Sequence, residues 1–381
     1  MSKVNLISAV TSLCAGLFLL VYLGFFFIRR PHICVRKTLA GLRSRDERRA
    51  LTLALAGTLG VGNIYGVALG IMVGGAGSVF WLFISSIFAM VIKYSECVLA
   101  ADGNFSGKGM MVPIEDTFGK AGKLIARIYC LLMLLLSLFM GAFIQSDSII
   151  TSASSFLPPS KILIASIFLI SIFVATFRGG EGIKNVAEMA IPVASAFYIA
   201  LCLIIIIKRA DMIPGVVVYV MRSAFEPRAL LSGVAISQGF CRGLLSNEAG
   251  AGTSAMAHSE VKRSAADAGL FGILEVFFDT DLLCMLTAAV ILLEVDSPGK
   301  YLAPMDLVFS AFSSGAGKLS LVPLLICIFL FAHSTVICWY YYGTRCLEYL
   351  GVKNLTIPFV CTFFVFIISP AFICGYFAVF A

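Results

Sequence analysis

The sequence predicts an all-α membrane protein that crosses the bilayer many times. Of its 381 residues, 60% are apolar and 13% are charged, whereas a soluble domain carries about 25% charged residues. Apolar runs of about 20 residues, which cross about 30 Å of hydrocarbon as a helix, recur along the chain. A β-barrel would instead show alternating segments of about 10 residues. Composition and run length therefore both indicate a bundle of transmembrane helices.

Ten apolar runs are long enough to be candidate spans. Their approximate ranges are 4–28, 50–73, 76–100, 124–150, 160–177, 189–207, 228–258, 268–294, 318–342 and 355–380. The first run is too long for a signal peptide and is followed by a basic segment, so we expect it to be a true span.

The distribution of basic residues predicts the orientation. If the N-terminus lies outside, the alternate loops contain 18 Lys and Arg residues and the opposite side contains 8. By the positive-inside rule, the loop 29–49 is then cytoplasmic. The net charge of +7 requires no nucleic acid partner, because anionic lipid headgroups attract the same segments.

The sequence contains no pattern typical of enzymes. Its twelve Cys residues form no C-x-x-C pair, its three His residues lie in unrelated segments, and it has neither a G-x-S-x-G motif nor a P-loop. We therefore expect no enzymatic activity, no cofactor and no structural metal site.

Two of the predicted spans should break in the middle. Residues 57–66 (GTLGVGNIYG) hold four glycines, and residues 242–254 (RGLLSNEAGAGTS) add a carboxylate and an amide to their glycines. A glycine inside a helix costs roughly 1 kcal/mol. Backbone that leaves a helix at membrane depth must face protein or a cavity, because an unpaired peptide group in hydrocarbon costs several kcal/mol.

Such breaks can serve binding or packing. Helix-end carbonyls attract cations, and helix-start amides attract carboxylates. Alternatively, the spacing of Gly62 and Gly66 allows two helices to pack closely without a ligand. Interrupted spans at matching positions favour a transporter made of two inverted repeats, with its site at the midplane. The predicted division is 1–49, an N-terminal helix and basic loop, followed by the halves 50–210 and 211–381.

Six stretches, in order along the chain, resemble the alanine or glycine:cation symporter family. They are 57–81, 93–100, Gln145 within MGAFIQSDS, 242–259, 277–288 and 334–350. The resemblance implies a leucine-transporter-type fold of five plus five inverted helices, here with one extra N-terminal helix and with the last helix apparently missing. It implies symport of a small neutral amino acid such as alanine or glycine with sodium or protons, in a bacterial-type plasma membrane. The alternative is a truncated or degenerate membrane protein that acts as a sensor or scaffold without transport.

The resemblance also implies which residues bind the substrate. They would be Gly60, Val61, Gly62 and Asn63 from one break, Leu245, Ser246 and Asn247 from the other, and Gln145, Thr335 and Trp339 from neighbouring spans. Trp339 and Leu245 would limit the ligand to small side chains. Two alternatives remain open: Trp339 begins the run WYYY and could belong to an interfacial aromatic belt, and Gln145 could serve only as a bond between helices.

The coupling cation would be bound by oxygen atoms, which suit a hard ion. The implied residues are Val61, Asn63, Ser334 and Thr335. Because the family usually has threonine where this chain has Val61, one hydroxyl is missing.

We expect the remaining ionisable residues to serve mainly in structural contacts. Glu248 should brace the broken helix by accepting hydrogen bonds from the backbone or Arg242, with a proton-carrying role as the alternative. Lys93 and Glu96 should form a pair on a helix surface. The partner of Asp279 cannot be predicted from sequence.

Overall fold

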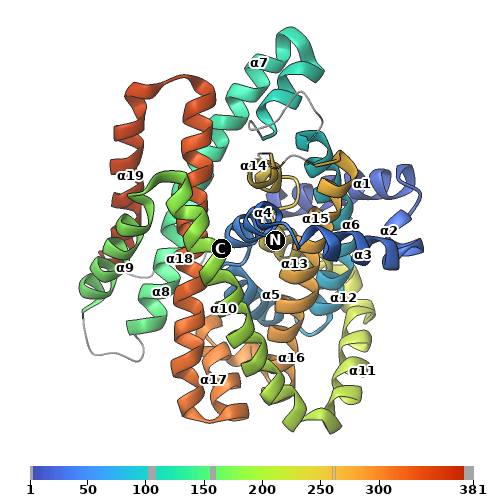
Figure 1. Cartoon of the computed structure of the whole chain (residues 1–381). Helices are drawn as coiled ribbons and strands as arrows, with labels where there is room; N and C mark the ends of the chain where they lie inside the picture. The colour runs from blue at the N-terminus through green and yellow to red at the C-terminus, as the bar shows by residue number, and fades with distance from the viewer. Residues whose placement is uncertain (1–2, 102–108, 155–159, 260, 262, 373–381) are drawn as a thin grey trace.

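The structure is a bundle of helices, as the composition predicts (Figure 1). In a computed structural model of the chain, residues 3–101, 109–154, 160–259, 261 and 263–372 are described. All regular secondary structure within these residues is helical. The predicted all-α class is therefore confirmed.

The helices follow one another with short connections. Up to residue 208 they are α1 (Lys3–Tyr22), α2 (Phe26–Arg29), α3 (Pro31–Gly41), α4 (Arg45–Thr58), α5 (Val67–Gly74), α6 (Gly77–Ala101), α7 (Met111–Leu136), α8 (Gln145–Ser154), α9 (Lys161–Thr176) and α10 (Gly179–Lys208). The later helices are α11 (Ile213–Ala224), α12 (Pro227–Ser232), α13 (Val234–Asn247), α14 (Thr253–His258), α15 (Ala265–Val276), α16 (Met285–Glu294), α17 (Pro304–Ala316), α18 (Leu321–Leu350) and α19 (Thr356–Ile368). Three π-helical segments, η1 (Gly62–Gly66), η2 (Ser137–Ile144) and η4 (Phe277–Cys284), continue directly into α5, α8 and α16.

Helices occupy the described parts of all ten predicted ranges, but their lengths differ. Five continuous stretches in the described chain are long and apolar enough to cross a membrane, and a bent pair, Arg45–Thr58 with Gly62–Gly74, makes a sixth. The apolar helices Lys161–Thr176 and Thr356–Ala371 are shorter. The end of the predicted range 355–380 falls partly outside the described residues.

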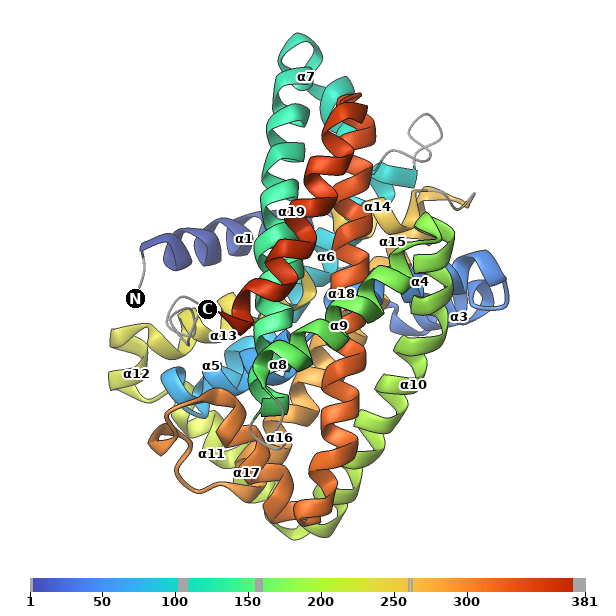
Figure 2. The same ribbon diagram turned by 90° about the vertical axis from the view of Figure 1, so that its left-hand side faces the viewer.

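The first predicted span is interrupted. α1 ends at Tyr22, and Gly24 and Phe25 adopt left-handed backbone conformations before α2 begins. In Figure 2, α1 runs across the long axis of α18 rather than along it. The range 4–28 therefore does not form one continuous helix.

Glycines allow α6 to pack closely against two later helices. α6 contacts both α13 and α15. A Cβ atom at Gly239 of α13 would lie 2.5 Å from the Ser78 carbonyl oxygen, and one at Gly272 of α15 would lie 2.7 Å from the Lys93 carbonyl oxygen. Small residues at such contacts let helix backbones approach in a membrane.

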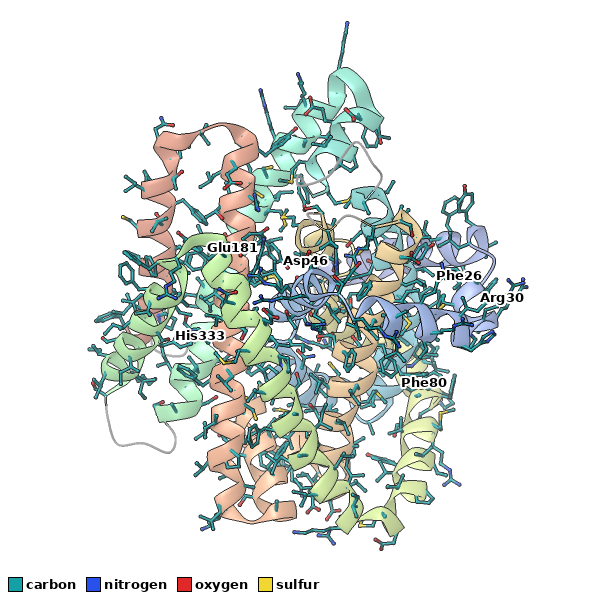
Figure 3. All side chains as sticks on the ribbon, in the orientation of Figure 1. Phe26, Arg30, Asp46, Phe80, Glu181 and His333 are labelled. Carbon is teal, nitrogen blue, oxygen red and sulfur yellow. The ribbon has the colours of Figure 1, made fainter. Side chains whose placement is uncertain are left out.

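The first broken helix lies between the long helices and is covered by α17. α4 packs against α10, α14 and α18 (Figure 2), while η1 contacts α13, α17 and η4. Neither α11 nor α17 was predicted, because their ranges fall between the apolar runs. Arg49 of α4 donates hydrogen bonds to Glu181 of α10 at 2.9 Å and to Asn185 at 2.8 Å. Asp46 and Glu181, which are labelled in Figure 3, line a pocket together.

Candidate binding site

The second predicted span breaks where its glycines are densest. α4 ends at Thr58, and the chain resumes a helical path only from Gly62, with a bend of 51° between the two parts. The Val61 amide, which leaves the helical ladder, donates a hydrogen bond of 3.0 Å to Gln145 Oε1. The predicted break is therefore present, and a side chain from α8 satisfies one of its peptide groups.

Gly60 allows two further side chains to approach this break. A Cβ atom at Gly60 would lie 2.9 Å from Thr335 Oγ1 and 3.0 Å from Gln145 Oε1. Thr335 Oγ1 donates a hydrogen bond of 3.0 Å to the Ala56 carbonyl. Three residues predicted from separate spans thus meet at one point.

The seventh predicted span breaks between α13 and α14. Glu248, Gly250 and Gly252 all have positive φ angles, which reverse the helical path three times in five residues. The freed Gly250 amide donates to Glu96 Oε1 at 2.6 Å, and the Ala251 carbonyl accepts from the Tyr129 hydroxyl at 2.9 Å. Here α6 and α7 provide the hydrogen bonds that the helix has lost.

Both breaks line one cavity of about 270 Å³. Seven of the ten residues predicted to bind substrate line it, namely Gly60, Val61, Gly62, Gln145, Leu245, Ser246 and Trp339. Tyr65, Arg242 and Glu248 line it as well, although the sequence did not place them in the site. Both Arg242 and Glu248 are charged residues inside a predicted membrane span, and this was the available signal.

Asn63 and Asn247 lie behind the cavity rather than in its wall. Asn63 Nδ2 donates to Asp279 Oδ1 at 2.7 Å, and Ser246 Oγ donates to Asp279 Oδ2 at 2.8 Å. Asn247 Nδ2 donates to Thr280 Oγ1 at 3.1 Å, and Thr280 Oγ1 donates to Asp279 Oδ2 at 2.9 Å. Asp279, whose partners could not be predicted, thus ties the two broken helices together.

Comparison with known proteins identifies the family. The profile of the sodium:alanine symporter family matches residues 3–379. The chain belongs to that family. It is therefore a multi-pass integral membrane protein of a transporter class, not of an enzyme class.

Individual relatives agree over most of the chain. The sodium/alanine symporter AgcS of Methanococcus maripaludis is 30% identical over 387 residues, which cover 92% of this chain and 83% of AgcS. An uncharacterized transporter of Haemophilus influenzae is 29% identical over 369 residues, covering 91% of this chain and 80% of that protein. Among solved structures, that of MhsT in complex with L-phenylalanine matches with a TM-score of 0.66 at 14% identity, over 86% of this chain and 79% of MhsT. The match to MhsT confirms the leucine-transporter-type fold.

Trp339 of the symporter is held by Glu248. Its indole Nε1 donates a hydrogen bond of 3.0 Å to Glu248 Oε1, and only 2% of the residue is exposed. The indole therefore does not belong to an exposed aromatic belt. Its Cβ packs on Gly141, where any larger side chain would collide with it. The expectation that Glu248 accepts from the backbone or Arg242 is corrected, because the partner found for Glu248 Oε1 is the indole N–H.

The predicted surface pair of Lys93 and Glu96 is wrong. Lys93 is fully buried and forms an ion pair with Glu275 at 3.2 Å, and its Nζ donates to Ser254 Oγ at 2.5 Å. Glu96 is also buried and accepts from the Gly250 amide. Both side chains point inward because α6 is covered by α13, α14 and α15 on that side.

Of the four residues predicted to bind the cation, Ser334, Thr335 and Val61 lie at the first break with no acidic partner in the described part of the chain, whereas the side chain of Asn63 is bonded to Asp279. Thr335 lies beside Gly60 at the first break, and the neighbouring Ser334 Oγ is buried without a hydrogen-bond partner among the described residues. Val61 lines the cavity, whereas the Asn63 side chain is engaged with Asp279. Hydroxyl and carbonyl oxygens at this break are ligands of the kind that Na⁺ accepts.

Proposed function

We propose that this protein is a secondary active symporter that carries a small neutral amino acid, alanine or glycine, together with sodium or protons by alternating access. The halves 50–210 and 211–381 would be the two inverted repeats. The observation that carries the proposal is the single cavity lined by both broken helices, by Gln145 and by Trp339. A volume of about 270 Å³ is small beside the roughly 300–1,000 Å³ of pockets for drug-sized ligands.

The two breaks offer opposite ends of helices to a zwitterion. The helix that starts at Gly62 presents amide groups, and the end of α13 at Leu245 and Ser246 presents carbonyl groups. A carboxylate is favoured at the first and an ammonium group at the second. Trp339 and Leu245 would then bound the space left for the substrate side chain.

For the cation, we place sodium beside the first break, where Ser334 and Thr335 supply hydroxyl oxygens and Val61 and Asn63 would supply backbone carbonyls. The unpartnered Ser334 Oγ supports this position, because a buried hydroxyl usually has a partner. The names of two relatives are consistent with sodium as a coupling ion. AgcS is called a sodium/alanine symporter. A relative from Bacillus sp. PS3 is called a sodium/proton-dependent alanine carrier; it is 29% identical over 332 residues, which cover 79% of this chain and 72% of that protein.

Uptake of radiolabelled alanine into proteoliposomes, with and without an inward sodium gradient, tests the proposal. We expect sodium-stimulated uptake. Gln145→Ala should weaken it about 5- to 150-fold, because an orphaned buried amide costs about 1–3 kcal/mol. Asn247→Ala should also reduce uptake, since it removes the hydrogen bond to Thr280.

A matched control removes a different amide. Asn185 lies on α10, outside the cavity, and bonds to Arg49, so Asn185→Ala should leave uptake within about twofold. Wild-type protein that takes up neither alanine nor glycine under any ion gradient would contradict the proposal and favour a non-transporting role.

A further inference from the structure

Glu248 stands in an unusual position at the second break. Its φ angle is 56°, and apart from Phe25 it is the only non-glycine residue with positive φ in the described chain. Such backbone costs about 1–3 kcal/mol and persists only where the surroundings fix it. The residue is 7% exposed and its side chain lines the cavity. The strained turn therefore positions the Glu248 carboxyl group in the cavity wall.

The two oxygens of this carboxyl group have different surroundings. Oε1 accepts the Trp339 indole N–H at 3.0 Å. Oε2 is buried and has no hydrogen-bond partner among the described residues. Thr253 lies within reach of the Glu248 carboxyl group, but its Oγ1 is buried and has no hydrogen bond of good geometry among the described residues. Neither Glu248 Oε2 nor Thr253 Oγ1 therefore has a well-formed hydrogen bond, although buried polar atoms are nearly always paired.

Among the described residues, the one cation whose charge acts on Glu248 is already paired with another carboxylate. The titratable groups that interact with Glu248 come from several elements: Lys93 of α6, Tyr129 of α7, Asp279 of η4, and Cys338 and Tyr342 of α18. Lys93, the only cation in this set, is already paired with Glu275 at 3.2 Å. Arg242, on the same helix, lines the cavity and interacts with Tyr65 on the other break.

The wider cluster also contains too few cations. Arg263 forms an ion pair with Glu47 and bonds to His258 Nδ1, and His258 Nε2 bonds to Glu275. With Nδ1 accepting and Nε2 donating, His258 is neutral. Lys93 and Arg263 are thus paired with Glu275 and Glu47, and among the described residues Glu96 and Glu248 have no ion pair. A buried carboxylate without a partner is costly enough that it takes up a proton instead.

We propose that Glu248 is a proton-binding site of the substrate cavity, protonated at Oε2 when the amino acid is bound. A hydronium ion or buffer acid from the solvent gives its proton to Oε2, which forms the O–H bond and releases water or the buffer base, and the negative charge of the carboxylate disappears. The new hydroxyl donates to Thr253 Oγ1, while Oε1 keeps its bond to Trp339. The inference rests on the proposed function, because the proton is taken up when the transported amino acid binds.

Substrate binding and protonation should favour each other. An amino acid that fills the cavity displaces water from the carboxyl group, which raises the cost of its ionised form. Linkage requires the reciprocal effect, so a proton on Glu248 must strengthen amino acid binding by the same factor.

The test is proton uptake by the purified full-length protein. Alanine is added to protein in weakly buffered solution at fixed sodium concentration, and a pH indicator follows the proton. We expect uptake of up to about one proton per alanine bound, and an alanine Kd that rises by up to about tenfold per pH unit on the alkaline side of the titration. Glu248→Gln should abolish proton uptake and make the Kd independent of pH. Wild-type protein that binds alanine without proton uptake, or a Glu248→Gln variant that keeps it, would overturn the proposal.

Two variants separate this role from a structural one. Glu96→Gln should retain proton uptake, because Glu96 does not line the cavity and is bonded to the Gly250 amide. Trp339→Phe removes the donor to Oε1 and so destabilises the ionised form, which should move the pH dependence to higher pH. If Glu96→Gln rather than Glu248→Gln removes proton uptake, the assignment is wrong. Sodium-driven alanine uptake without proton binding would refute this inference alone, whereas absence of alanine binding at every pH and sodium concentration would refute the proposed function as well.

Discussion

The two broken helices are kept open by different means. At the first break, shape decides: Gly60 admits Thr335 and Gln145 to the backbone, and the hydrogen bonds there involve neutral groups. At the second, left-handed backbone at Glu248, Gly250 and Gly252 is surrounded by buried charges from α6 and α15. The first break is thus sensitive to volume and the second to charge.

This difference bears on how each break can respond to ions. A neutral break with hydroxyl and carbonyl oxygens suits a cation such as sodium. A break with more carboxyl groups than cations responds to protons. One cavity that contacts both breaks can therefore sense two ions through separate residues.

The largest expected effect comes from removing the charge behind the second break. Lys93→Met would leave Glu275 buried without its ion pair. Breaking a buried ion pair in this way costs about 3–5 kcal/mol, because the remaining charge is uncompensated. Thermal unfolding in detergent should show a correspondingly lower midpoint.

The double variant Lys93→Met with Glu275→Gln gives the control. It removes both charges, so it should recover part of the stability lost in Lys93→Met. If the two substitutions are simply additive, the pair does not act as a unit and the charge-based description of the second break is wrong.

Adding a single methyl group at Gly60 tests whether the first break depends on space. Gly60→Ala would place a Cβ atom 2.9 Å from Thr335 Oγ1. Overpacking of this kind costs about 1–3 kcal/mol, so alanine binding should weaken about 5- to 150-fold in an equilibrium binding assay. Gly215→Ala, outside the cavity, is the control, because a Cβ atom there meets nothing within 4 Å. Equal losses in both variants would show that the collision at Gly60 is not the cause.

Trp339 offers a smaller effect on specificity. Trp339→Leu should enlarge the cavity and let it admit a longer side chain, as competition of unlabelled amino acids against labelled alanine would measure. One methylene in an apolar pocket changes discrimination by about 1–3 kcal/mol. Unchanged selectivity would place the substrate side chain away from the indole.

Sequence alone located the breaks but not what supports them. Glycine density marked 57–66 and 242–254, and a polar residue inside an apolar span marked Gln145, because both features are costly in a membrane. The pairing of Lys93 with Glu275 joins residues 182 positions apart, and the bond from Trp339 to Glu248 joins residues 91 positions apart. No local spacing rule reports such contacts, so Lys93 was assigned to the surface from its neighbour Glu96.

An exposed carboxylate on α15 should matter least. Asp267, in the first turn of α15, accepts from Ser264 Oγ at 2.6 Å and from Lys37 at 3.0 Å, with 42% of its side chain exposed. Both contacts are made by the ionised carboxylate, so they are lost when Asp267 takes up a proton, which an ordinary Asp does at about pH 3.9.

Asp267→Asn should therefore lower stability at neutral pH by less than about 1 kcal/mol, because exposed pairs are screened by water. The difference from wild type should shrink below about pH 4, as thermal unfolding across pH would show. Lys93 and Asp267 each form one ion pair near the same helix, but only the first is buried. If Asp267→Asn destabilises the protein as much as Lys93→Met, burial is not what gives the charges at the second break their importance.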